Sequence, residues 1–135
     1  MNSGLGNLVS VLKKIERNQR RYSNNPPEYT VHTEAEYTIA GGIITLTGYN
    51  QIRYMTIDTQ ADAASDDLDT ISGGVAGDLI ICRAAHTDRT VVVKHNTGNM
   101  RLNGAADFSL DSSSDTIMLI YTGAIWTMIA NSNNA

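Results

Sequence analysis

Cys82 and the three histidines are the residues whose chemistry could support nucleophilic catalysis. Cys82 lies inside the apolar run DLIIC and not at a strand end or helix start, where a thiolate could be stabilised. His32, His86 and His95 lie in or beside predicted strands, without the H-x-x-x-H or H-E-x-x-H spacing of metalloenzymes. A Cys82 and His95 pair from neighbouring strands stays open as an alternative. The sequence therefore predicts that the protein is not an enzyme and needs no cofactor.

Two loops collect carboxylates, the type of ligand that calcium prefers. The spacing lacks the D-x-D-x-D-G order and the closing glutamate of a calcium loop, so we expect solvated loop acids and no metal site. The residues are Asp62, Asp66, Asp67 and Asp69 in one loop, and Asp111 and Asp115 in the other. The glycine-rich run 73–77 has no lysine after it and precedes a strand, which indicates a turn and not a phosphate cradle.

The charge is divided unevenly along the 135 residues. The formal net charge is −4; residues 1–25 hold five basic side chains and one acidic one, or +4, which leaves −8 for the rest. The basic side chains are Lys13, Lys14, Arg17, Arg20 and Arg21. An acidic body repels nucleic acid, so specific nucleic-acid binding is not indicated, whereas a short basic arm suits an acidic protein partner.

An apolar stripe indicates one helix over residues 4–22. Leu5, Leu8, Leu12 and Ile15 follow a 3-4-3 spacing, and prolines at 26 and 27 end the helix. A helix this short is marginal alone, so its stripe needs a partner surface. That surface is either the chain's own second domain or other copies, and the residue types favour three or four strands in a coiled coil. The basic residues follow the apolar stretch, the reverse of a secretory signal, and no apolar run is long enough to span a membrane.

After residue 26 the sequence alternates short β-branched runs with turn residues. We expect a domain over 26–135 made of eight to ten antiparallel strands, a mainly β sandwich or jelly-roll-like fold preceded by the one helix of an anchoring arm at 1–25. The clearest unit is a hairpin from 117 to 129 around a two-residue turn at 122–123, with both faces covered by the core or by a trimer contact. Its core and contact residues are Ile117, Leu119, Tyr121, Ile125, Trp126 and Met128.

Residues 70–130 resemble a module of tailed-bacteriophage virion proteins. The matching segments are GDLI at 77–80, RTVVVKHNTGNMRL at 89–102, FSL at 108–110 and DTIMLIY at 115–121 followed by Trp126. The resemblance implies a homotrimeric structural protein with an all-β distal domain and an attaching N-terminal segment, and it brings no catalytic residues.

The short chain favours a small capsid-decorating (cement) or short head-fibre protein. Its place would be the capsid surface of the virion, its partners other copies and the major capsid protein, and it would have no membrane partner. The alternative is a receptor-binding fibre tip or lectin-like module that binds a host glycan, with Tyr49 and Tyr54 as candidate contacts.

Overall fold

The computed structural model describes residues 6–15, 34–48 and 52–134. They belong to two separate units, one with the helix and one with the strands, and each unit is described by itself. The helix occupies residues 6–15. This confirms a helix near the N-terminus, while both ends of the predicted span 4–22 lie outside the described residues.

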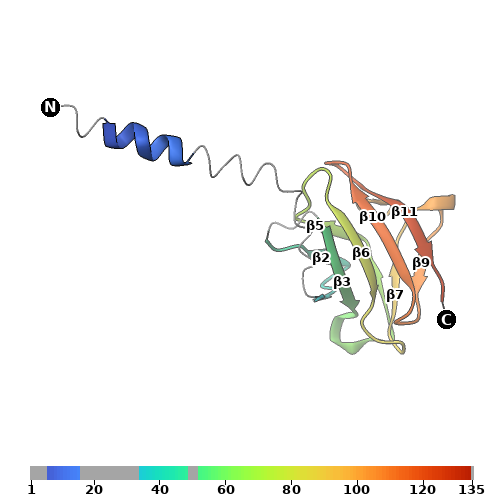
Figure 1. Ribbon diagram of the computed structural model, residues 1–135. Helices are drawn as coiled ribbons and strands as arrows, with labels where there is room; N and C mark the ends of the chain where they lie inside the picture. The colour runs from blue at the N-terminus through green and yellow to red at the C-terminus, as the bar shows by residue number, and fades with distance from the viewer. Residues whose placement is uncertain (1–5, 16–33, 49–51, 135) are drawn as a thin grey trace. The chain divides into compact units, whose positions relative to one another are not determined.

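The described part of the second unit has eleven strands and two short 3-10 helices, and Figure 1 shows how the strands are arranged. The strands are β1 (Ala35–Thr38), β2 (Ile43–Thr45), β3 (Ile52–Asp58), β4 (Ser65–Leu68), β5 (Thr70–Ser72), β6 (Leu79–Ala84), β7 (Thr90–Val93), β8 (Met100–Arg101), β9 (Phe108–Leu110), β10 (Thr116–Tyr121) and β11 (Trp126–Ser132). The 3-10 helices are η1 (Gln60–Asp62) and η2 (Asn103–Ala105). The strands form a six-stranded sheet in the order β1-β3-β6-β10-β11-β8, a three-stranded sheet β4-β7-β9 and a two-stranded sheet β2-β5.

Parallel pairing between successive turns of the chain organises this unit. β1, β3 and β6 run parallel in one sheet, β2 and β5 in a second, and β4 and β7 in the third. Met55 therefore lies beside Cys82, 27 positions later, and Ile44 lies beside Ile71, also 27 positions later. The chain passes through three short sheets in turn and then stacks on its previous coil, as in a β-solenoid.

The expectation of an antiparallel sandwich or jelly roll was therefore wrong, although a mainly β fold is confirmed. Parallel strands need a long crossover, and the sequence shows no room for crossover helices. In this chain the crossover is made of strands that belong to the other sheets. Short strands split by glycine and polar residues look the same in both architectures.

The C-terminal strands reverse this direction. β9 runs antiparallel to β7, and β10 runs antiparallel to β6 and pairs with β11 in the predicted hairpin. The expected two-residue turn is a four-residue loop, since Tyr121 pairs with Trp126 and the Thr122 N–H donates to the Ile125 carbonyl at 2.9 Å. A bulge follows, because Met118 pairs with Ala130 whereas Leu119 pairs with Met128.

The core is a single cluster enclosed by the three sheets. Alternate residues of β6 and β10 point inward, so Ile80, Cys82, Ile117 and Leu119 are buried. Trp126, at the start of β11, is fully buried in the same cluster. The hairpin thus has its inner face in the core, while its outer face is accessible within this chain, and the trimer contact expected to cover a face stays a prediction.

Candidate interaction surfaces

The helix presents a broad apolar seam that is exposed among the described residues of its unit. Five apolar side chains between residues 8 and 15 are 44 to 54% exposed: Leu8, Val9, Val11, Leu12 and Ile15. Residues 8, 11, 12 and 15 fall on one face of a helix, so the stripe is wider than the predicted 3-4 repeat. Val9 and Val11 were missed although their apolar character is plain in the sequence.

The basic residues of the arm are only partly described. Lys13 and Lys14 lie on the helix and are exposed. Leu5, Arg17, Arg20 and Arg21 fall outside the described residues, as do His32 and Tyr49. The structure thus places two of the five basic side chains on the helix, and the predicted role of all five in attachment stays a prediction.

Three of the six residues predicted for the core or a trimer contact are core residues, and the other three are half-buried. Ile117, Leu119 and Trp126 are fully buried in the chain's own core and are not available to a partner. Tyr121, Ile125 and Met128 are half-buried. Tyr121 stacks against Trp126 with the ring centroids 4.8 Å apart, and Met128 packs on the core cluster.

The outer side of the six-stranded sheet carries a different apolar set, which the sequence analysis missed. Strand pairing aligns the outward residues in two rows across β3, β6, β10 and β11, which lie side by side in Figure 1. One row is Ile52, Leu79, Ile120 and Thr127; the other is Tyr54, Ile81, Met118 and Ala130. We call these eight residues the outer apolar face. All of them are half-buried or exposed, and none is charged.

A polar border lies along one side of this face. Arg83 follows Ile81 on the outer side of β6; its guanidinium donates to the Tyr54 hydroxyl at 3.1 Å and forms an ion pair with Glu34 at 2.9 Å. The Tyr54 hydroxyl, which was a candidate glycan contact, is thus engaged within its own chain. Glu36 is exposed on β1, at the edge of the same sheet.

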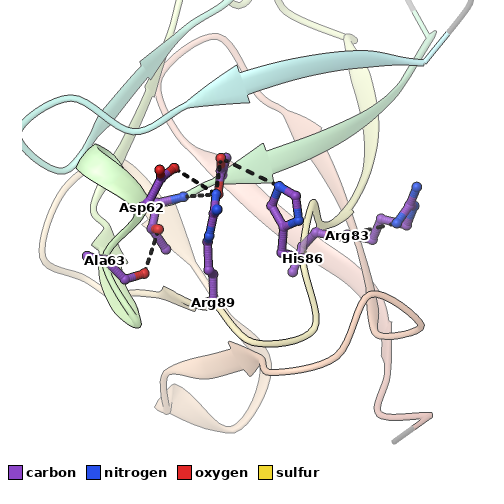
Figure 2. A network of polar contacts seen from close by, with 8 residues as sticks. Asp62, Ala63, Arg83, His86 and Arg89 are labelled. Carbon is purple, nitrogen blue, oxygen red and sulfur yellow. Dashed lines mark hydrogen bonds and ion pairs between the residues drawn. The ribbon is translucent and has the colours of Figure 1, made fainter.

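A second polar cluster ties two corners of the solenoid together. The Arg89 guanidinium binds both carboxylate oxygens of Asp58, at 2.8 and 3.1 Å, and Asp62 at 2.8 Å. Figure 2 shows Arg89 and His86 pointing toward the same carboxylate, with the His86 imidazole 3.8 Å from Asp58. The hydrogen bond to Asp58 raises the pKa of Arg89 above its usual value. Asp58, Asp62, His86 and Arg89 all have a partner within the chain, which favours a structural role for this cluster.

The expected inertness of Cys82 follows from its position in the middle of the core. It lies between Met55 and Ile117 in adjacent strands and is fully buried. Burial raises the pKa of its thiol to about 12, so almost no thiolate is present at neutral pH. His95 instead accepts a hydrogen bond from the Leu102 N–H at its Nδ1, 2.9 Å away. These positions give no support to a Cys82 and His95 nucleophilic pair.

The carboxylates predicted as solvated loop acids are only partly so, because Asp66 and Asp67 lie on strand β4 and Asp115 is fully buried. Asp66 accepts hydrogen bonds from the main chain of Gln60 and Asp67, and Lys94 forms ion pairs with Asp67 and Asp107. Within residues 6–15, 34–48 and 52–134, no group of three or more histidine, cysteine, aspartate or glutamate side chains is arranged to hold a metal ion. In the same described residues, no helix has the length and apolar character needed to cross a bilayer.

Arg53 is a buried cation with neutral partners. It is 6% exposed and points inward from β3, where its two terminal nitrogens donate to the Tyr37 hydroxyl and to the carbonyls of Thr47 and Gly48. Its Nε is buried without a partner among the described residues. Arg53 thus holds the chain between β2 and β3 against the core.

Comparison with known proteins gives no indication of function, so the functional argument depends on the surfaces described above. No protein family matches the chain, and no curated protein is detectably similar to it.

Proposed function

We propose that the protein is a structural component of a tailed-bacteriophage virion, a homotrimeric decoration protein that attaches to the capsid through its N-terminal helix and stabilises the head. The proposal combines the resemblance of residues 70–130 with the division of the chain into a helical unit and a β unit that has its own core. The observation that carries it is the apolar seam of the helix, where five large side chains remain 44 to 54% exposed.

The seam supports an attachment role because exposed apolar side chains at this density mark contact surfaces. The β unit has its own core and does not need the helix to complete it. Lys13 and Lys14 add positive charge beside the seam, which suits an acidic surface on a capsid shell. The acidic β unit would then face the solvent.

Binding to particles tests this proposal with the full chain. Purified protein is mixed with heads of the phage that encodes it, made without the protein, and the bound fraction is measured after sedimentation. Leu8→Asp or Leu12→Asp should abolish binding at any ionic strength, because a carboxylate cannot be buried unpaired in an apolar contact.

Charge reversal separates the two components of attachment. Lys13→Glu with Lys14→Glu should weaken binding mainly at low salt, because exposed charges are screened over about 8 Å at physiological ionic strength. Asp88→Asn, an exposed change in the β unit, is the control and should leave binding unchanged. Wild-type protein that fails to bind heads, or that binds isolated tails instead, would refute the decoration role.

A further inference from the structure

The sequence contains a single asparagine that is followed by glycine, the pair Asn103-Gly104. The pair opens η2, in the link between β8 and β9, and residues 103–107 are all exposed. Leu102, directly before the pair, is only 5% exposed and belongs to the core cluster. The core thus ends at the residue before Asn103, and the pair itself faces the solvent.

The side chain of Asn103 lacks the contacts that fix two other asparagines. The Asn99 amide donates to the Ile71 carbonyl at 2.8 Å. The Asn134 amide donates to the Ser114 carbonyl at 2.9 Å. Among the residues that the structure describes, no hydrogen bond or ion pair holds the side chain of Asn103. No such contact therefore keeps its amide carbon away from the main chain of the next residue.

The main chain of Gly104 leaves that approach open. Glycine has no Cβ, so no side chain shields its main-chain nitrogen. The surrounding space is also open, since among the described residues no atom beyond its chain neighbours lies within 4 Å of the position that a Cβ would take. Gly104 and Ala105 have φ of 72 and 53°, so the segment is not a regular right-handed helix. The Gly104 N–H lies in the first turn of η2, where N–H groups have no partner within the turn.

We infer that Asn103 is a site of spontaneous deamidation. The Gly104 nitrogen gives up its proton to solvent and attacks the side-chain carbonyl carbon of Asn103, and the new N–C bond closes a succinimide ring. The amide nitrogen of Asn103 takes up a proton and leaves as ammonia. Water then opens the ring at either carbonyl, which gives aspartate or isoaspartate at this position. Water is the only co-reactant, and asparagine is one of the thermolabile residues of proteins.

The deamidated protein should remain folded. Either product adds one negative charge to a β unit that is already acidic, and isoaspartate also lengthens the main chain by one carbon. The exposed residues 103–107 can absorb this change without displacing the core residues on either side, Leu102 and Leu110. A more acidic, folded form would thus accumulate as the protein ages. The inference does not rest on the proposed function, so either can fail without the other.

Peptide mapping of the full chain tests the inference with an internal control. The folded protein is held at mildly alkaline pH, which favours loss of the N–H proton, and samples are digested with trypsin over time. Cleavage after Lys94 and Arg101 separates Asn96 from Asn103. Deamidation adds about 1 Da, because an amide becomes a carboxyl group. Asn103 should convert at least about tenfold faster than Asn96, which is also exposed but precedes a threonine whose side chain hinders the attack.

A matched pair of variants and the isolated product complete the test. Asn103→Gln should abolish conversion at 103, because the longer side chain would have to close a larger ring, and Asn96→Gln should leave that conversion unchanged. Ion exchange separates the acidic form of the wild type, which should melt within a few degrees of the unmodified protein. Equal rates at Asn96 and Asn103, or no conversion at Asn103, would overturn the inference. An acidic form that is unfolded would overturn the claim that the fold tolerates the change.

Discussion

The side-chain amide of Asn99 pairs with both main-chain polar groups of Ile71. Asn99 Oδ1 accepts from the Ile71 N–H at 3.0 Å, and Asn99 Nδ2 donates to the Ile71 carbonyl at 2.8 Å. The same carbonyl also accepts from the indole N–H of Trp126, at 2.9 Å. A side chain thus takes the place of a neighbouring strand on the edge of β5 that faces away from β2, and the polar groups of Ile71, which is buried, are satisfied there.

Asn99→Ala should lower the free energy of unfolding by about 1 to 3 kcal/mol, because it leaves both polar groups of Ile71 without this partner. Asn99→Asp should cost at least as much at neutral pH, since a carboxylate oxygen would then face the Ile71 carbonyl. Urea denaturation measures both changes. Asn103→Ala, an exposed position, is the control and should change stability by less than about 0.5 kcal/mol; equal losses at 99 and 103 would contradict this role.

Trp126→Ala should destabilise the protein by about 3 to 5 kcal/mol, since it empties a fully buried site. Trp126→Phe keeps most of the ring volume and loses the hydrogen bond to Ile71, so it should cost less. The wild-type protein has a single tryptophan, so its fluorescence should be blue-shifted when folded and should report unfolding directly. A Trp126→Ala variant that melts within a few degrees of the wild type would show that this side chain is not part of the core.

Cys82 should make stability depend on pH in the alkaline range. Its folded-state pKa of about 12 lies above the ordinary value of 9.0, so its contribution is fully present below pH 9 and is lost as the pH rises toward 12. The unfolding free energy of the wild type should therefore fall more steeply above pH 9 than that of Cys82→Ala. A thiol reagent at pH 8 should label Cys82 only after denaturation. Rapid labelling of the folded protein would contradict its burial.

Asp115 should contribute to stability at neutral pH and lose that contribution in acid. Burial opposes its ionisation, but hydrogen bonds from the main chain of Asn134, Asp111 and Ser112 outweigh burial and hold its pKa below the usual 3.8. Its contribution is therefore present above pH 3.8 and disappears as the pH falls through the lowered pKa.

Asp115→Asn should be less stable than the wild type at pH 7, with the difference shrinking below pH 3.8. Thermal melts across this range measure it, and Asp88→Asn, an exposed aspartate, is the control. A pH-independent difference at position 115 would argue against the ionised carboxylate.

The sequence was sufficient for the helix near the N-terminus, the β content, the C-terminal hairpin and the burial of Trp126. The sequence could not predict which residues of the sheet face the core and which face outward, because β6 is apolar at adjacent positions such as Ile80 and Ile81. When inward and outward residues are equally apolar, the alternation of side chains along a strand does not distinguish core positions from surface positions. The parallel stacking of coils was also hidden, since Met55 and Cys82 share a position in the fold but no sequence similarity marks the repeat.

The antiparallel direction of β9 and β10 limits where further coils could be added to this β-solenoid. β1, β3 and β6 add in one direction, each on the edge left by the one before, whereas β9 and β10 run against β7 and β6 and occupy those edges in the opposite sense. The edges of β6 and β7 on which a further parallel coil would stack are therefore already occupied by antiparallel strands. An additional coil would therefore have to be inserted between the existing ones, where a repeat of 27 residues would match the spacing between Ile44 and Ile71. The antiparallel C-terminal strands would then still close the end of the solenoid.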